Sequence, residues 1–306
     1  MTLKVYLGPV RPESLRAVIE AQARLIPQAG AEVVVWTDPF AVKDLLGTIG
    51  PSTRWVSLPV AGVDRYITAG IIDDRRVWTA TKGIYGDVVA EHALALLLAA
   101  VRGVVAAARA RTWGTRQGWR LRGETVAVLG TGGIGQGVAT RLSAFGAACI
   151  GINRGGHATS GFTEVMPLER RLEALERSRA AVMALPLTAS TSGLVGLPEL
   201  EALGPEGVLV NVGRGECIDQ SALVDVLVAR RLGFAVLDVT DPEPLPADHP
   251  LWKLDNVVIT PHLANPYRSW PWDACVVEYT DHINRNLSAY VAGQPLEGVI
   301  DLAAGY

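Results

Sequence analysis

The chain has 306 residues, of which 49% are hydrophobic, and its 28 Lys and Arg against 31 Asp and Glu give a net charge of −3. This length suits about two domains, and the apolar content excludes a wholly disordered chain. The nearly balanced charge argues against a protein that binds nucleic acid or anionic lipid through its overall field. We expect no metal site, because Cys149, Cys217 and Cys275 lack ligand spacing. With no signal peptide and no apolar run of membrane-spanning length, a cytoplasmic protein is expected.

Short apolar strands alternate with helices along the first part of the chain, which is typical of a parallel sheet covered on both faces. A long helix rich in Ala and Leu is expected from residue 87 to about residue 110. The other expected elements are strands at 3–7, 32–36, 54–58 and 77–79 and a helix at 12–26.

A second α/β series follows a stretch rich in Gly and Arg at residues 111–122. Its expected strands are 125–129, 148–152, 180–184, 207–211, 234–238 and 257–260, and its helices are 135–145, 168–178, 220–230 and 272–292. We therefore predict an α/β protein with two Rossmann-like, doubly wound parallel-sheet domains. The domain of residues 85–264 is expected to be inserted into a domain made of residues 1–84 and 265–306.

A GxGxxG motif stands directly after the strand at 125–129 and opens the following helix. Gly130 permits the tight turn, Gly132 lets the backbone approach a pyrophosphate, and Gly135 lets the helix pack closely on the strand. The helix N-terminus would then face the phosphates with its N–H groups. The alternative is an ordinary structural turn, but the strand before and the helix after favour a dinucleotide site.

The end of the second strand of this series bears on the choice between NAD and NADP. An acidic residue there would bind the 2′-hydroxyl of NAD, whereas this chain has Asn153 followed by Arg154. Asn153 does not repel a 2′-phosphate and Arg154 can bind one, so NADP is favoured over NAD. The alternative is that Arg154 is a solvent-facing arginine compatible with either cofactor.

Three polar residues, Arg214, Glu243 and His262, follow predicted strands of the second series. In an open parallel sheet, ligands bind outside the carboxyl ends of the strands, so these side chains can converge on a bound cofactor. Arginine can hold a carboxylate, histidine can transfer the alcohol proton, and glutamate can orient and favour a protonated imidazole. This chemistry fits a 2-oxo acid. The alternatives are that Arg214 is a surface cation, that Glu243 is a solvated carboxylate and that His262 is a histidine of the core.

The order of several motifs resembles the D-isomer-specific 2-hydroxyacid dehydrogenase family over about residues 55–300. The motifs are VAGVD at 60–64, VAEH at 89–92, LRGE leading into GTGGIG, LPLT at 185–188, NVGRG at 211–215, LDVTDPEP at 237–244, PHLA at 261–264 and GQPL at 293–296. The resemblance implies that 85–264 is the NAD(P)-binding domain and that 1–84 with 265–306 is the substrate domain. It also implies a homodimer.

The resemblance implies a role for individual residues as well. Arg214 would bind substrate, His262 would be the acid/base, Glu243 its partner, and the backbone amides of Ala61 and Gly62 a second contact for the substrate carboxylate. The implied cofactor contacts are Gly130, Gly132, Gly133, Ile134, Gly135, Asn153, Arg154, Leu185, Pro186, Thr191, Val212, Gly213, Asp238, His262 and Ala264. Asp238 would meet the nicotinamide carboxamide.

Some residues keep two interpretations. Tyr85, Trp270 and Trp272 could wall the substrate pocket, or could pack in the core, and Lys82 could add charge to the site or lie in a solvated turn. His92, within the long helix, is expected to be structural.

The sequence thus predicts an oxidoreductase that reduces a small 2-oxo acid, of the glyoxylate or hydroxypyruvate kind, to a D-2-hydroxy acid with NADP or NAD. A formate or phosphite dehydrogenase on the same fold is one alternative, although the formate branch leads us to expect glutamine where Glu243 stands. A non-catalytic, dinucleotide-sensing interaction protein, like the C-terminal-binding corepressors, is the other.

Overall fold

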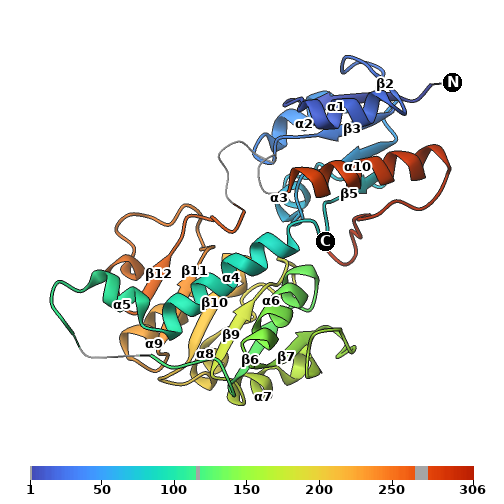
Figure 1. Cartoon of the computed structure of the whole chain (residues 1–306). Helices are drawn as coiled ribbons and strands as arrows, with labels where there is room; N and C mark the ends of the chain where they lie inside the picture. Colours follow the sequence, from blue (N-terminus) through green and yellow to red (C-terminus); the bar gives the residue numbers. More distant parts are fainter. Residues whose placement is uncertain (1, 115–117, 266–274) are drawn as a thin grey trace. The chain divides into compact units, whose positions relative to one another are not determined.

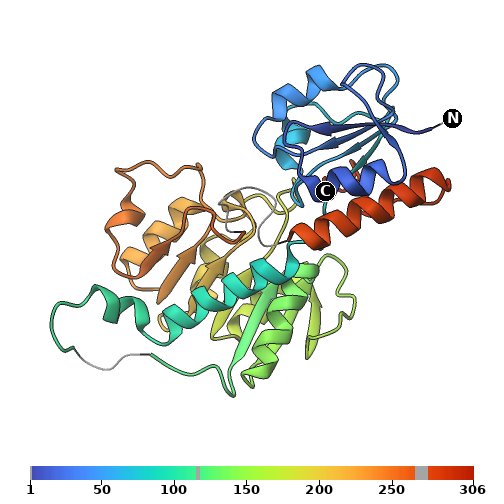
Figure 2. The same ribbon diagram turned by 45° about the horizontal axis from the view of Figure 1, so that its top comes forward.

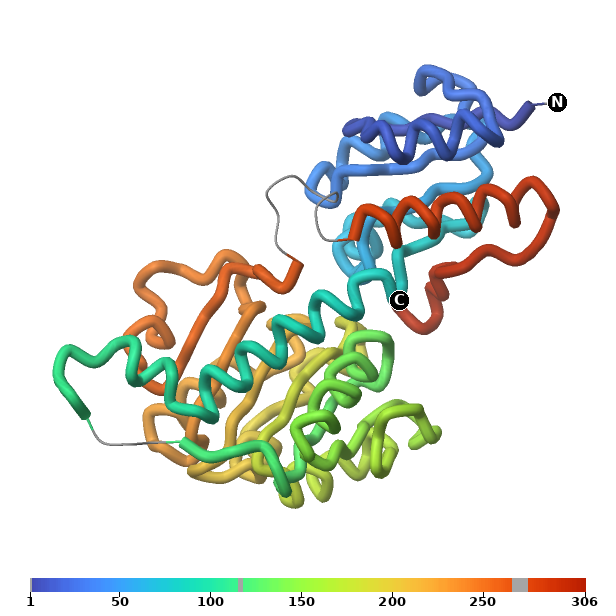
Figure 3. The backbone as a smooth tube through the Cα atoms, viewed as in Figure 1, coloured from blue at the N-terminus to red at the C-terminus, as the bar shows by residue number. Residues whose placement is uncertain are grey.

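The computed structural model describes residues 2–114, 118–265 and 275–306. It divides into two compact units, Met1–Tyr85 with Pro266–Tyr306 and Gly86–Asn265 (Figure 1). In each unit the neighbouring strands of the sheet are parallel, which confirms the predicted pair of parallel α/β domains. In Figure 3 the colours separate the blue strands and red helix of the first unit from the green-to-orange elements of the second.

The first unit has a five-stranded sheet in the order β2-β1-β3-β4-β5. Its elements are β1 (Lys4–Gly8), α1 (Glu13–Glu20), β2 (Arg24–Leu25), β3 (Val33–Trp36), α2 (Val42–Thr48), β4 (Trp55–Ser57), α3 (Asp64–Thr68), β5 (Val77–Thr79) and α10 (Val276–Val291). Leu15 and Ile19 of α1 and Tyr279 and Ile283 of α10 pack in one core. Helices α2 and α3 contribute to the other.

The second unit has a seven-stranded sheet in the order β12-β11-β10-β9-β6-β7-β8, the Rossmann arrangement, with the change of direction between β6 and β9. Its strands are β6 (Thr125–Leu129), β7 (Ala148–Asn153), β8 (Glu164–Pro167), β9 (Ala180–Met183), β10 (Val208–Asn211), β11 (Phe234–Leu237) and β12 (Val257–Ile259). The inner strands carry runs of consecutive buried residues, mostly Val, Ile, Leu and Ala, as strands covered on two sides do, whereas the edge strands β8 and β12 each have one buried residue.

Helices cover both faces of this second sheet (Figure 2). They are α4 (Gly86–Val101), α5 (Val104–Arg109), α6 (Gly133–Ala144), η1 (Leu168–Arg170), α7 (Arg171–Glu176), α8 (Leu197–Ala202), η2 (Gly215–Cys217), α9 (Gln220–Val228) and η3 (Pro250–Lys253). Helices α7, α8 and α9 share one core with the strands. Helices α4 and α6 pack against each other, and a Cβ on Gly137 would lie only 2.8 Å from that of Ala90.

Two expected helices are wrong in extent. The helix expected at 12–26 ends at Glu20, because the amide of Arg24 donates to the carbonyl of Leu3 and the chain continues as β2 beside β1. The helix expected from 87 to 110 is two helices, because Gly103 lies between them with a φ of +65°, a conformation that ends a helix.

Several short elements were not predicted from the sequence. Helices α2, α3 and α8 and strands β2 and β8 are each seven residues long or fewer, too short to establish a hydrophobic period. The last helix begins at Val276 in the structure, and residues 272–274 of the expected helix lie outside the described residues.

Candidate active site

The glycine turn joins β6 to α6 in the second unit. Gly130 has a φ of +102°, and a Cβ there would lie 2.5 Å from the carbonyl oxygen of Ala184. A Cβ on Gly135 would clash with the carbonyl oxygen of Gly130, so this glycine is what lets α6 start so close to the strand. Gly132 instead is exposed, and a Cβ there would meet nothing within 4 Å. The turn is therefore closed toward the protein and open at Gly132, beside the start of α6.

The loop after β7 is organised by the side chain of Asn153. Its Nδ2 donates to Oγ1 of Thr131 at 3.0 Å and to the carbonyl of His157 at 2.9 Å, and its Oδ1 accepts from the amide of His157 at 3.1 Å. Asn153 therefore links this loop to the glycine turn, and Arg154 follows it at an exposed position.

The loops that follow β9 and β10 lie against each other. A Cβ on Gly213 would lie 2.7 Å from the carbonyl oxygen of Leu185. Oγ1 of Thr191 donates to the carbonyl of Pro186 at 2.6 Å and accepts from the amide of Thr188 at 2.8 Å, which closes the 186–191 loop on itself. These residues, with the buried Val212, line the carboxyl edge of the sheet next to the glycine turn.

Arg214 stands in a turn fixed by the buried Asn211. Oδ1 of Asn211 accepts from the amide of Gly213 at 3.0 Å, and its Nδ2 donates to the carbonyl of Arg214 at 2.9 Å. Gly215 comes next, and a Cβ there would clash with the backbone carbonyl of Thr240. The turn that carries Arg214 thus lies in direct contact with the loop after β11.

The same loop after β11 carries Glu243, and Glu243 pairs with His262. Nδ1 of His262 lies 2.6 Å from Oε1 of Glu243, and both side chains are partly exposed. A neutral or protonated imidazole can donate through Nδ1 to the carboxylate, which leaves Nε2 for a reacting group. The structure therefore brings Glu243 and His262 together. It also packs the turn that carries Arg214 against the loop that carries Glu243.

Asp238 lies at the end of β11 with its carboxylate fully buried. Oδ1 accepts from Nε2 of His92 at 3.2 Å, from the hydroxyl of Thr260 and from the amide of Leu263 at 2.8 Å, and Oδ2 accepts from the amide of Ala264 at 3.0 Å. Burial by itself raises the pKa of Asp238, but these hydrogen bonds hold it below its usual value. Asp238 is therefore a charged group at neutral pH.

The partnership of His92 with Asp238 was missed at the level of sequence. His92 was expected to be structural, and nothing in the pattern of α4 points to a residue 146 positions away. Only the packing of α4 against β11 brings the imidazole and the carboxylate together.

Other candidates belong to the first unit or to undescribed positions. Ala61 and Gly62 are half-buried in the loop between β4 and α3. Tyr85 is buried, with its hydroxyl donating to the carbonyl of Pro59 at 2.8 Å. Nζ of Lys82 donates to the carbonyl of Val299 at 3.1 Å. Trp270 and Trp272 lie outside the described residues.

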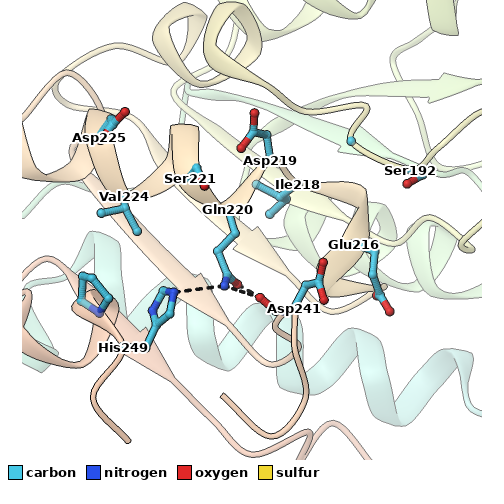
Figure 4. Close-up of a pocket in the computed structure, with 12 residues that line it drawn as sticks. Ser192, Glu216, Ile218, Asp219, Gln220, Ser221, Val224, Asp225, Asp241 and His249 are labelled. Carbon is cyan, nitrogen blue, oxygen red and sulfur yellow. Dashed lines mark hydrogen bonds between the residues drawn. The ribbon is translucent and has the colours of Figure 1, made fainter. Parts of the chain in front are cut away.

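A large cavity of the second unit, about 760 Å³, lies around the N-terminus of α9 (Figure 4). Gln220 reaches across it, with Nε2 3.3 Å from Nε2 of His249 and also bonded to the carbonyl of Asp241. Glu216, Asp219, Asp225 and Asp241 give its lining an acidic character. The lining includes neither Arg214, Glu243 nor His262. The lining of the cavity therefore does not include the His262–Glu243 pair.

Across 2–114, 118–265 and 275–306, His, Cys, Asp and Glu form no group of three or more that could hold a metal ion. Over the same part of the chain, each helix falls short of the length or apolarity that a membrane crossing requires.

Comparison with known proteins gives consistent matches. Residues 94–264 match the model of the D-isomer specific 2-hydroxyacid dehydrogenase, NAD binding domain. The chain is 33% identical over 267 residues to a glyoxylate reductase of Korarchaeum cryptofilum, covering 83% of this chain and 77% of the relative. It is 31% identical over 292 residues to glyoxylate/hydroxypyruvate reductase B of Pectobacterium atrosepticum, covering 89% and 86%.

A solved structure extends the match to the whole chain. The D-isomer specific 2-hydroxyacid dehydrogenase of Xanthobacter autotrophicus Py2, crystallised with NADPH and MES, superposes with a TM-score of 0.83 at 26% identity, covering 100% of this chain and 99% of that one. On these matches, and with the fold and glycine turn in agreement, the protein belongs to the D-isomer specific 2-hydroxyacid dehydrogenase family and is a nicotinamide-dinucleotide-dependent oxidoreductase.

Proposed function

We propose that the protein reduces a small 2-oxo acid, of the glyoxylate or hydroxypyruvate kind, to the D-2-hydroxy acid, and that it prefers NADPH to NADH. The observation that carries the proposal is the 2.6 Å contact between His262 and Glu243, beside the turn that bears Arg214. The names of the two reductases that the chain resembles support the same substrate class.

The residues at the carboxyl edge of the second sheet fit a dinucleotide. The open position of Gly132 at the start of α6 leaves room for phosphate oxygens near the helix N–H groups. We assign the pyrophosphate to Gly130, Gly132, Gly133, Ile134 and Gly135, the adenosine side to Asn153, Arg154, Leu185, Pro186 and Thr191, and the nicotinamide side to Val212, Gly213, Asp238, His262 and Ala264. When bound, the dinucleotide supplies the hydride.

The preference for NADPH follows from the loop after β7. Asn153 is neutral and its side chain is engaged with Thr131 and His157, so no carboxylate repels a 2′-phosphate at this position. Arg154, exposed beside it, supplies a guanidinium that can bind the phosphate. The NADPH complex of the Xanthobacter relative supports this choice.

In this mechanism Arg214 binds the substrate carboxylate and polarises the adjacent carbonyl group. We also propose that the backbone amides of Ala61 and Gly62, in the first unit, contact the substrate. His262 gives its Nε2 proton to the carbonyl oxygen as that atom gains negative charge. Glu243 accepts from Nδ1 throughout, which keeps the imidazole oriented.

A substrate panel tests the function. Purified protein is mixed with glyoxylate, hydroxypyruvate, pyruvate or phenylpyruvate and with NADPH or NADH, and cofactor oxidation is followed at 340 nm. We expect turnover with glyoxylate or hydroxypyruvate and a higher kcat/KM for NADPH. Absence of turnover with every acid, together with tight cofactor binding, would contradict the proposal and favour a dinucleotide-sensing interaction protein. Oxidation of formate or phosphite would instead indicate the other alternative.

Arg214→Ala tests the carboxylate contact separately. The expected result is a loss of kcat/KM for the oxo acid with little change in the dissociation constant of NADPH; an unchanged kcat/KM would refute the assignment.

The resemblance also leads us to propose a homodimer, which sedimentation equilibrium can check.

A further inference from the structure

Three consecutive backbone amides of the loop after β12 donate to one residue, Asp238. The amide of His262 donates to the main-chain carbonyl of Asp238 at 2.9 Å. The amide of Leu263 donates to Oδ1 of Asp238 at 2.8 Å, and that of Ala264 to Oδ2 at 3.0 Å. The loop that bears His262 is therefore fastened to the end of β11 through both the backbone and the carboxylate of Asp238.

His262 needs this support because its backbone is unusual. It is one of two non-glycine residues with a positive φ among the described residues, at +53°. A side chain with a Cβ adopts this left-handed region at a cost, and surrounding contacts must hold it there. The backbone amides of His262 itself and of the next residue, Leu263, both donate to Asp238, so these hydrogen bonds lie on either side of the unusual φ and ψ angles.

His92 completes the arrangement from α4. Its Nε2 lies 3.2 Å from Oδ1 of Asp238, the carboxylate is fully buried, and the imidazole is 21% exposed. A buried carboxylate needs donors to offset the water it has lost, and His92 and Thr260 are its side-chain donors. Without His92, Oδ1 would keep two donors and the carboxylate would be freer to shift.

We propose that His92 and Asp238 act as a pair of positioning residues that hold the His262 loop in its left-handed conformation and so aim the imidazole at the reacting oxygen. This inference rests on the proposed role of His262 as the acid. It gives His92 a part in turnover, and it gives Asp238 a function that does not require contact with the cofactor.

Substitutions at His92 test the pair in the full-length protein. In His92→Phe, which keeps a ring but removes the donor, kcat with the best oxo acid of the panel is expected to fall about tenfold, since small displacements of a reacting group are costly. The KM of the acid and the dissociation constant of NADPH, measured by fluorescence, are expected to stay within about twofold. In His92→Gln, whose amide nitrogen can replace Nε2, kcat is expected to recover to within about threefold of the parent.

Further variants keep the test independent of folding. Glu91→Gln, at the exposed neighbouring position on α4, is the control and is expected to match the parent. Thr260→Val removes the other side-chain donor and is expected to lower kcat as His92→Phe does. Thermal unfolding of each variant shows whether it is folded at the assay temperature.

Three results would overturn the inference: normal kcat in folded His92→Phe, equal loss in the Phe and Gln variants, or a loss confined to NADPH binding. The last would assign Asp238 to the cofactor. His262→Ala in the same assay separates the two proposals. Normal turnover in His262→Ala refutes the proposed function, whereas slow His262→Ala beside normal His92→Phe refutes only the positioning pair.

Discussion

Nδ1 of His262 lies 2.6 Å from Oε1 of Glu243, although the two residues are 19 positions apart. They meet because β11 and β12 are neighbouring parallel strands, so the segments that follow them leave the sheet at the same edge. A carboxylate at this distance accepts a hydrogen bond from the Nδ1–H group of His262. Nε2 of the same ring is then the nitrogen that remains available to a reacting group.

This pairing predicts strong coupling between the two side chains. His262→Ala is expected to lower kcat by at least ~100-fold, because it removes the proposed proton donor. Glu243→Gln keeps an acceptor but removes the charge, so a smaller loss of about tenfold is expected. The double variant is expected to be no slower than His262→Ala, since we propose that Glu243 acts through the imidazole. Steady-state kinetics of the four proteins check this cycle, and additive losses would show that Glu243 has an independent role.

Gly215 provides a test of the contact between the Arg214 turn and the Glu243 loop. In Gly215→Ala the new Cβ meets the backbone carbonyl of Thr240, which is not a flexible group, so the loop must move. We expect a lower thermal midpoint and a loss of kcat/KM for the oxo acid. Gly47→Ala is the matched control, because Gly47 lies in α2 with open space around it, and there a small gain of ~0.5–1 kcal/mol is expected. A Gly215→Ala protein that is both as stable and as active as the parent would contradict the contact.

Sequence reasoning was accurate for the elements that have a strong local signal. The strands expected near 125–129, 180–184 and 234–238 were identified from apolar runs bounded by glycine or polar residues, and the structure confirms them as β6, β9 and β11. Where tertiary pairing competes with local preference, the pattern was misleading, as at Arg24, which leaves the helical pattern to pair beside β1. The break at Gly103 was not anticipated, because isolated glycines also occur within helices.

The same distinction between local signals and tertiary contacts applies to the residues of the candidate site. The sequence singled out Arg214, Glu243 and His262 as candidates, because each follows a predicted strand and carries a recognisable chemistry. The link from His92 to Asp238 depends on the side-chain packing of α4 over the sheet, and no spacing along the chain encodes it. The engagement of Asn153 with Thr131 and His157 was equally invisible, since it depends on how one loop folds back.

The proposed preference for NADPH can be tested at Arg154. In Arg154→Ser, kcat/KM with NADPH is expected to fall about tenfold or more through loss of a charge-assisted contact, while kcat/KM with NADH changes little. Asn153→Asp is expected to reduce NADPH use further, because the carboxylate repels a 2′-phosphate and loses the donor bonds to Thr131 and His157. Equal effects on both cofactors in Arg154→Ser would assign this arginine to the adenine ring or to solvent.

His282 in α10 gives a prediction about stability and pH. It is 2% exposed, and burial lowers the pKa of its imidazole below 6.5; Glu297 opposes this shift, and the charge of Arg285 adds to it. The unfolded chain therefore takes up a proton at His282 at a higher pH than the folded protein does. As the pH falls below about 6.5, this difference favours unfolding, and the stability contributed by neutral His282 is progressively lost.

The variant His282→Gln isolates this contribution. At pH 7.5 it is expected to be less stable than the parent, because the contacts with Asn286 and Glu297 are altered. Between pH 7 and pH 5.5 its thermal midpoint is expected to fall less than that of the parent, so the two curves converge. Glu297 does not interfere in this window, because its hydrogen bond with Arg285 holds its pKa below 4.5. The other histidines are common to both proteins and cancel in the comparison. A His282→Gln curve that runs parallel to that of the parent would show that His282 does not titrate differently on unfolding.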